Sequence, residues 1–176
     1  MYIEILILGL LHRKPMHGYE IKLSVEKITG VNSVTNSQLY PTLARFIEAG
    51  FISKEVVPQE KKPDRHLYSI TAHGECGLRE MLIDVTPALL FRDREFYARV
   101  ACFSLLSSEE RVAILAMRKN GLLQRKERVA SWSAKGWVAK TARLRDLLLS
   151  TELATIEDWI QEETSYDKGE IGGKHA

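Results

Sequence analysis

The sequence predicts a mainly α-helical protein with one small β-hairpin. Along most of the chain, apolar residues recur at spacings of three and four, which is typical of amphipathic helices. One region alternates apolar and polar residues instead: FISKEVV (51–57) and RHLYSI (65–70) are separated by the turn PQEKKPD. That pattern indicates two antiparallel strands joined by a turn. We therefore expect helices on both sides of a single hairpin.

Three helices are expected before the hairpin. Residues 2–12 are apolar on nearly every side, so this helix should be buried. Residues 19–30 carry an apolar stripe and end at a glycine suited to a helix C-terminus. The third helix begins near Asn36 or Ser37, whose side chains can cap it. Pro41 lies in its first turns, where a proline costs fewer hydrogen bonds than it does deeper in a helix.

A fourth helix is expected from Thr71 to about residue 84, and the whole order predicts a winged helix-turn-helix over residues 1–86. Residues 87–164 show only helical patterns, over 91–106, 108–131 and 138–163. Ser107 and Glu110 form a capping box before the second of these helices. We expect a C-terminal helical domain over residues 87–164 and a disordered tail over the polar, glycine-rich residues 165–176.

Composition and motifs exclude several classes of protein. The net charge is only +2, so a nucleic-acid site would depend on where the positive residues lie. The two cysteines and five histidines lack metal-ligand spacing, and no nucleotide-binding loop or catalytic motif is present. We expect no enzyme, cofactor or metal. The apolar N-terminus is too short to span a bilayer and lacks the features of a signal peptide, which predicts a cytoplasmic protein.

The third helix and the hairpin suit DNA. A winged helix places its third helix in the major groove and its hairpin against the backbone or the minor groove. The predicted DNA-binding residues are Asn36, Ser37, Gln38, Tyr40, Thr42 and Arg45 on the helix, Lys61, Lys62, Arg65 and His66 on the hairpin, and His17 before the second helix. The alternative is a winged-helix protein-interaction module whose polar residues serve solubility.

The second half suits dimerisation, because its last helix is long and leucine-rich. The predicted dimer interface contains Phe96, Val100, Phe103, Leu144, Leu147, Leu148, Ile156, Trp159 and Ile160. Packing within one chain is the alternative. Tyr19, Trp132, Trp137 and Arg99 are candidates for an effector pocket, with ordinary core packing as the alternative for the tryptophans. Tyr19 and His17 could instead contact phosphate.

Five motifs together resemble the PadR family of transcriptional regulators: ILGLL (7–11), HGYEI (17–21), LYPTL (39–43), EAGFI (48–52) and KPDRHLYSITAHG (62–74). Residues 91–104 and the helices after them are similar to the C-terminal domain of longer, virulence-activator-type members. The resemblance implies a homodimer on double-stranded DNA, usually acting as a repressor. The resemblance also implies possible control by a small aromatic or hydrophobic effector, to which some members of the family respond. Phe46 and Ile47 depart from the family's usual Leu-Glu at these positions.

Overall fold

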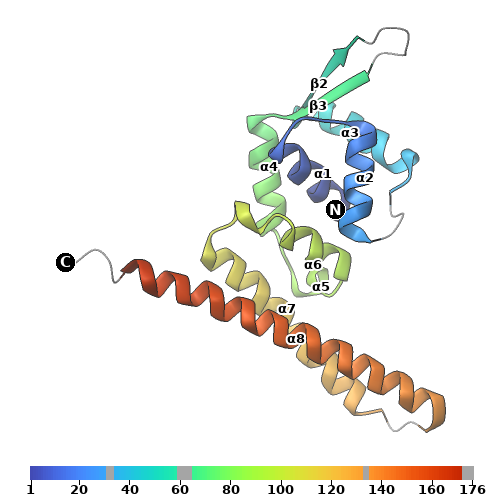
Figure 1. Cartoon of the computed structure of the whole chain (residues 1–176), viewed down its shortest axis with the longest axis vertical. Coiled ribbons are helices and arrows are strands. Elements are labelled where there is room, and N and C mark those ends of the chain that lie inside the picture. The colour runs from blue at the N-terminus through green and yellow to red at the C-terminus, as the bar shows by residue number, and fades with distance from the viewer. Residues whose placement is uncertain (31–33, 59–64, 133–134, 172–176) are drawn as a thin grey trace. The chain divides into compact units, whose positions relative to one another are not determined.

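The N-terminal part of the chain contains four helices and three short strands. Its helices are α1 (Tyr2–Arg13), α2 (Gly18–Thr29), α3 (Asn36–Glu48) and α4 (Ala72–Ile83), and its strands are β1 (Met16–His17), β2 (Ile52–Val57) and β3 (Arg65–Ile70). The computed structural model (Figure 1) describes residues 1–30, 34–58, 65–132 and 135–171, with side chains up to residue 165. This order of elements confirms the predicted winged helix-turn-helix.

The sheet is antiparallel, with the strand order β1-β3-β2. β2 and β3 pair from Ile52 opposite Ile70 to Val57 opposite Arg65. β1 adds a third strand in which Met16 lies opposite Tyr68. The sequence does not reveal this strand, because two residues are too few to show an alternating pattern. β1 thus ties the connection between α1 and α2 to the hairpin.

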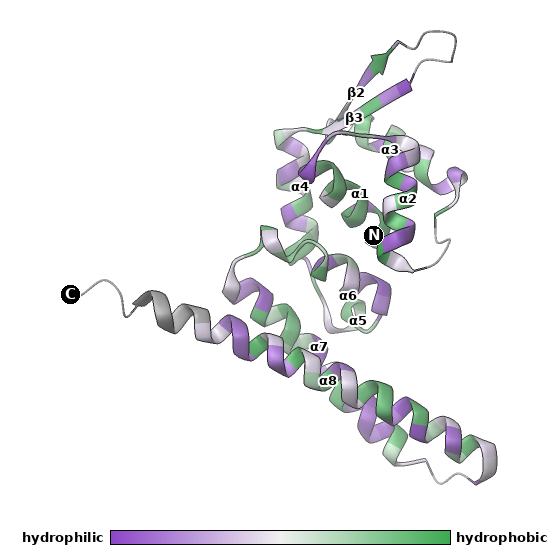
Figure 2. Cartoon of the chain, in the orientation of Figure 1, coloured by the Kyte–Doolittle hydropathy of each residue, from purple (hydrophilic) through white to green (hydrophobic). Residues whose placement is uncertain are grey.

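α1 lies at the centre of the apolar core. Its residues 5–11 are all buried, and Figure 2 colours the helix almost entirely as hydrophobic. α1 contacts α2, α4 and β3, so apolar side chains on every side of it are covered. On α3, Leu39 and Leu43 are 0% and 1% exposed and complete this core.

Glycine lets α4 approach the start of β2 closely. A Cβ atom at Gly74 would lie 2.0 Å from the carbonyl oxygen of Phe51, and one at Gly77 would lie 2.8 Å from the Phe51 ring. Only a residue without a side chain fits these two places. Thr71 caps the same helix by accepting a hydrogen bond from Gly74 N.

The C-terminal part contains α5 (Pro87–Leu90), α7 (Ser108–Ala130) and α8 (Gly136–Ile171), and α6 (Asp93–Val100) lies between α5 and α7 in the chain. Contacts divide the chain into two units. The first unit comprises residues 1–84 and 94–105, and the second comprises residues 85–93 and those from 106 onward. The predicted domain boundary at residue 87 therefore differs from the structure, since most of α6 packs with the winged part.

Buried charges explain why α6 joins the first unit. Arg99 is 0% exposed and donates to Glu95 Oε2 at 3.1 Å and to the carbonyl oxygen of Met81 at 3.1 Å. Glu95 in turn accepts from the backbone N of Tyr2 at the start of α1. A buried carboxylate and guanidinium are costly unless paired, so this set holds α6 against α1 and α4.

Two predicted boundaries in the C-terminal part are wrong. The single helix expected over residues 91–106 is interrupted after Val100 and continues as a 3-10 turn (Phe103–Leu105). There Arg13 donates to the carbonyl oxygen of Ala101, which replaces a hydrogen bond that a continuing helix would make. α8 continues to Ile171, so residues 165–171 of the predicted tail are helical, because each added residue extends a formed helix by one hydrogen bond. Residues 172–176 lie outside the described residues.

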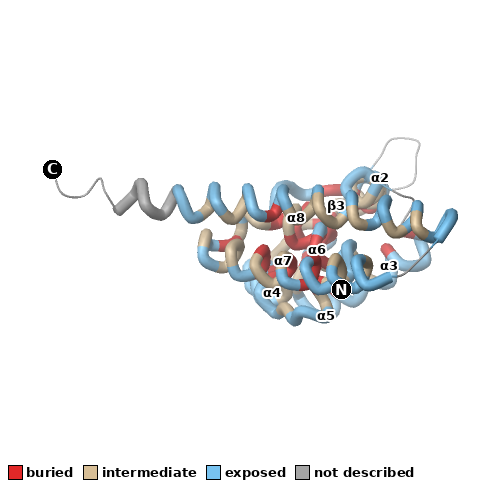
Figure 3. The backbone as a smooth tube through the Cα atoms, turned by 90° about the horizontal axis from the view of Figure 1, so that it is seen from below, coloured by how far each residue is buried: buried red, intermediate tan, exposed pale blue. Residues whose placement is uncertain are grey.

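α7 and α8 pack along each other and form most of the second unit. Figure 3 shows that most of α8 is exposed or of intermediate burial. In the part of the chain that the structure describes, no helix is both long and apolar enough to cross a membrane.

Candidate nucleic-acid interface

α3 has one buried and one exposed side. Leu39, Leu43 and Phe46 are at most 3% exposed and face the core. All but one of the polar residues predicted to contact DNA from this helix are exposed: Asn36, Ser37, Gln38, Tyr40 and Arg45. Thr42 is half-buried, because it lies nearer the core stripe. The structure therefore brings the predicted helix residues together on one accessible surface.

Several of these side chains are already hydrogen-bonded within α3. Gln38 Oε1 accepts from the backbone N of Thr35 at 3.2 Å, which completes a cap of the helix. The hydroxyl oxygens of Ser37 and Thr35 lie 2.7 Å apart. Thr42 Oγ1 donates to the carbonyl oxygen of Gln38 at 2.8 Å. The predicted contact of Gln38 with DNA thus competes with its role in capping.

Arg45 has an acidic partner on another helix. Its Nη2 donates to Glu4 Oε1 on α1, and its guanidinium lies 6.0 Å from the centre of the Phe46 ring. The Arg45 side chain is still 60% exposed, so the ion pair is a surface pair of modest strength. The sequence showed no sign of this pair, because the two residues are 41 positions apart.

His17 connects α2 to the hairpin. Its Nδ1 donates to the carbonyl oxygen of His66 at 2.9 Å, and its backbone N donates to Glu20 Oε2 at 2.8 Å. A carbonyl oxygen only accepts, so Nδ1 of His17 carries a proton in this hydrogen bond. His17 and His66 are half-buried, whereas Arg65 is exposed at the start of β3. The predicted wing residues Lys61 and Lys62 lie outside the described residues.

Tyr19 lies beside the start of α3. It is 67% exposed and lines a concavity of about 620 Å³ together with residues of α2 and the first residues of α3, including Asn36 and Ser37. The two roles left open for Tyr19, a phosphate contact at the start of α2 and a place in an effector pocket, both stay predictions. Tyr40 packs its ring against Gly18, where a Cβ would lie 3.2 Å away.

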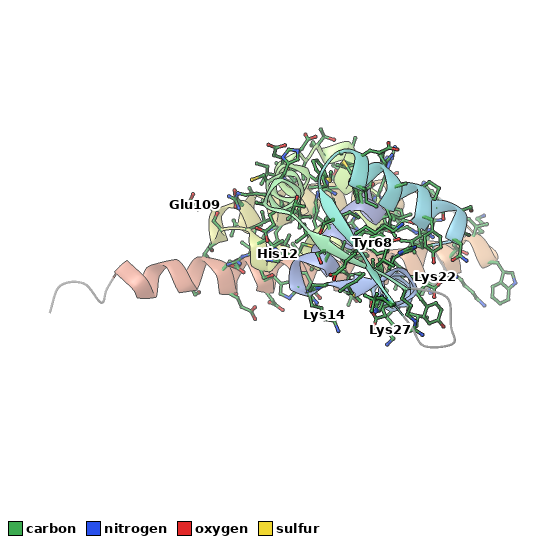
Figure 4. All side chains as sticks on the ribbon, turned by 90° about the horizontal axis from the view of Figure 1, so that it is seen from above. His12, Lys14, Lys22, Lys27, Tyr68 and Glu109 are labelled. Atoms are coloured by element: carbon green, nitrogen blue, oxygen red, sulfur yellow. The ribbon has the colours of Figure 1, made fainter. Side chains whose placement is uncertain are left out.

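Three further lysines belong to the first unit: Lys14 and Lys27 are exposed, and Lys22 is half-buried and paired with Glu26. Lys14 and Lys27 extend on the same side in Figure 4, and Lys22 lines the concavity beside Tyr19. They are scattered along the sequence, so no cluster marked them. Tyr68 of β3 is 5% exposed; burial raises its pKa, and nearby Tyr40 raises it further, so Tyr68 is neutral and uncharged near pH 7.

The predicted dimer residues fall into three groups. Leu144, Leu147 and Leu148 on α8 are 57–63% exposed and could contact a partner. Phe96 and Ile156 are each 1% exposed, so the chain itself covers the surface that the prediction assigned to a partner. The remaining four are half-buried: Val100, Phe103, Trp159 and Ile160.

The predicted effector residues are divided between the two units. Tyr19 and Arg99 belong to the first unit, and Arg99 is fully buried and paired, while Trp132 and Trp137 belong to the second. Only Trp132 lines the cavity of about 630 Å³ within the second unit. That cavity also contains three arginines, two carboxylates and apolar residues: Arg125, Arg128, Arg145, Asp93, Glu152, Val129, Leu148 and Leu149.

A buried arginine organises the second unit. Arg118 is 1% exposed and donates to Glu152 Oε1 at 2.6 Å, to Asp93 Oδ1 at 2.7 Å and to the carbonyl oxygen of Leu90. It therefore joins α7 to α8 and to the segment before α6. Burial opposes ionisation of Asp93, but hydrogen bonds and charge from Arg118, with help from Arg125, outweigh it and lower the Asp93 pKa.

Comparison with known proteins supports a regulatory family. The model of the "Transcriptional regulator PadR-like family" matches residues 7–80. The negative transcriptional regulator PadR of Bacillus subtilis (strain 168) is 31% identical over 105 residues. That match covers 59% of this chain, and the chain spans only 58% of the length of this curated relative.

Solved structures are also similar. A transcriptional regulator from Clostridium thermocellum is 27% identical with a TM-score of 0.41, over 45% of this chain and 77% of that one. Bacillus subtilis PadR in complex with operator DNA is 23% identical with a TM-score of 0.46, over 93% of this chain and 94% of that one.

Proposed function

We propose that this chain is a member of the transcriptional regulator PadR-like family, whose model matches residues 7–80, and that it is a dimeric regulator that binds specific sequences of double-stranded DNA. The observation that carries the proposal is the exposed side of α3, which presents polar and small residues beside an exposed arginine of the wing. A helix of this kind fits the major groove of B-DNA, and a neighbouring hairpin reaches the backbone.

Positively charged side chains outside α3 support contacts with the DNA backbone. Arg65 on β3 and Lys27 on α2 are exposed cations of the same unit, while Arg45 is paired with Glu4 and Lys22 with Glu26. Cations near the groove edge neutralise phosphates and fix the orientation of the protein without reading sequence. The predicted wing residues Lys61 and Lys62 would add to this set, together with His66 and His17.

Dimerisation is proposed through α8. Three leucines with more than half of their surface exposed lie within two turns of this helix, and such a patch is costly in water. Two chains joined here would present two copies of α3 to two related half-sites, which raises affinity well above that of one winged helix.

Repression and an effector belong to the same proposal. The curated relative is a negative regulator, which favours repression by this chain. The cavity beside Trp132 is of the size that holds a small aromatic or hydrophobic molecule. We expect such a regulator to act in the cytoplasm, where it meets the chromosome, and catalysis is no part of the proposal.

The experiment is fluorescence anisotropy of the full-length protein with duplex DNA from the promoter of its own gene. Scrambled duplex serves as competitor, and the salt concentration is varied. We expect binding that resists the competitor and weakens steeply with salt. Replacing Arg65 by alanine should weaken binding to all sequences alike and reduce the salt slope by about one.

Arg143→Ala is the matched control, because Arg143 is exposed on α8 in the second unit. It should leave both the affinity and the salt slope unchanged. Equal affinity for promoter and scrambled DNA in all duplexes tested would count against a sequence-specific regulator, and it would favour a winged helix that binds another protein.

A further inference from the structure

The middle of the outermost stripe of α3 carries no hydrogen-bonding side chain. Leu39, Leu43 and Phe46 face the core, and the positions opposite them on a helix of 3.6 residues per turn are Ser37, Pro41, Ala44 and Glu48. These four residues follow one another at spacings of four, three and four, and all are exposed. The centre of this stripe, Pro41 and Ala44, has no polar side-chain atom.

The polar side chains beside this stripe already form hydrogen bonds or an ion pair within the protein. Gln38 Oε1 caps α3, Thr42 Oγ1 donates to the carbonyl oxygen of Gln38, and Arg45 pairs with Glu4. Arginine and lysine are the side chains that most often read guanine, and the outermost stripe contains neither. Its one charge is Glu48, which phosphates repel. Polar readout by the centre of α3 is therefore limited.

One feature of the major groove suits small apolar side chains. Among the four bases, only thymine displays a methyl group there, and alanine is one of the residues that contact it. Pro41 and Ala44 are three positions apart, so they lie within about 5–6 Å of each other on the helix surface. That separation spans one to two steps along a DNA strand, at roughly 3.4 Å per step.

We infer that Pro41 and Ala44 read the 5-methyl groups of thymine, so that each half-site places thymines opposite the middle of α3. This inference rests on the proposed DNA-binding function and names the base that the same surface selects. Small side chains also let the backbone of α3 come close to the base edges, which brings both methyl contacts within range.

The test begins by selecting duplexes from a random pool with the full-length protein. Each thymine of the selected half-site is then replaced by uracil, which pairs identically but lacks the methyl group. Anisotropy compares the affinities. At one or two positions per half-site we expect binding to weaken by about fourfold for each methyl removed from a contact, and replacements elsewhere should have no effect.

Variants assign the effect to the protein. Ala44→Gly should reduce the ratio of thymine to uracil affinity to about one at its position, and Pro41→Ala should lower the ratio at the neighbouring position. Ala72→Gly is the matched control, because Ala72 is another exposed helical alanine, on α4. Both glycine variants weaken a helix, and comparing the two duplexes within each variant cancels that loss.

Different failures have different meanings. A selected sequence whose uracil duplexes all bind like the thymine duplex would overturn the methyl readout and leave the DNA-binding function intact. Full thymine preference in Ala44→Gly would exclude Ala44 as the reader. A pool that yields no preferred sequence would refute the proposed function, and this inference with it.

Discussion

The two units of this chain differ in how completely each covers its own apolar surface. In the first unit, α1 is surrounded by α2, α4 and β3, and its buried residues run without a gap from Ile5 to Leu11. In the second unit, α8 packs along α7 on one side and leaves Leu147 and Leu148 more than 60% exposed on the other.

The difference indicates different roles. Most side chains on the exposed side of α3 are small or polar. This is expected where the partner is a hydrated, charged polymer. The exposed surface of α8 is apolar, as expected where the partner is another protein surface. A chain that closes one core and leaves apolar surface open on the other unit fits the proposal of a first unit that binds DNA and a second unit that is completed by association.

The largest expected effect is on association. Replacing both Leu147 and Leu148 by glutamate should weaken dimerisation at least about a hundredfold, since each buried leucine contributes roughly 1.5–3 kcal/mol. Sedimentation equilibrium measures this directly. The control Gln124→Glu adds a charge to an exposed polar position of α7 and should leave the dimer intact. A double variant that remains dimeric at low micromolar concentration would place the interface elsewhere.

The next effect is on the folding of the second unit. Arg118→Ala should destabilise that unit by about 3–5 kcal/mol, because it leaves two carboxylates and a carbonyl without their buried donor. Urea unfolding followed by tryptophan fluorescence measures this unit selectively, since all three tryptophans belong to it.

The neighbouring residue provides the control for that measurement. Lys119 forms a surface pair with Glu157, so Lys119→Ala should cost less than about 1 kcal/mol. Equal losses for Arg118→Ala and Lys119→Ala would show that burial of Arg118 adds nothing to the stability of the second unit.

The smallest expected effect is on pH dependence. The pKa of Asp93 is lowered in the folded state, so its ionised form adds stability above the unfolded pKa of about 3.9, and this is lost as the pH falls through the lower, folded value. Asp93→Asn should therefore be less stable than the unaltered chain at pH 6, and the two should converge near pH 3. Urea unfolding at both values measures this, and a difference that grows on acidification would contradict the lowered pKa.

Local patterns predicted most of the first unit. Hydrophobic periodicity located α1 to α4, and β3 begins and ends where alternation predicted. The exposed position of Gln38 and Arg45 also followed from the periodicity of α3. Their hydrogen bonds did not, because the partner of Arg45 comes from another helix and Gln38 turns back to cap its own.

The boundary between the units shows where local patterns are insufficient. Residues 91–106 have the periodicity of one helix, yet they divide into α6 and a 3-10 turn, and residues 94–105 join the winged unit. The reasons are the burial of Arg99 and Glu95 against α1 and α4, and the bond from Arg13 to Ala101. These partners are distant in sequence, so periodicity carries no information about them.

The sequence by itself determined the winged helix-turn-helix, the exposed side of α3 and a leucine-rich last helix, because each depends on spacings of a few residues that backbone geometry converts into faces. Only the tertiary structure decided which buried arginine holds which helices, that Arg45 is paired with Glu4, and that Pro41 and Ala44 stand at the centre of the exposed stripe with their polar neighbours engaged. Those outcomes depend on contacts between residues that are distant in sequence, such as Glu4 and Arg45. Such contacts follow from the packing of the whole core and not from any one segment.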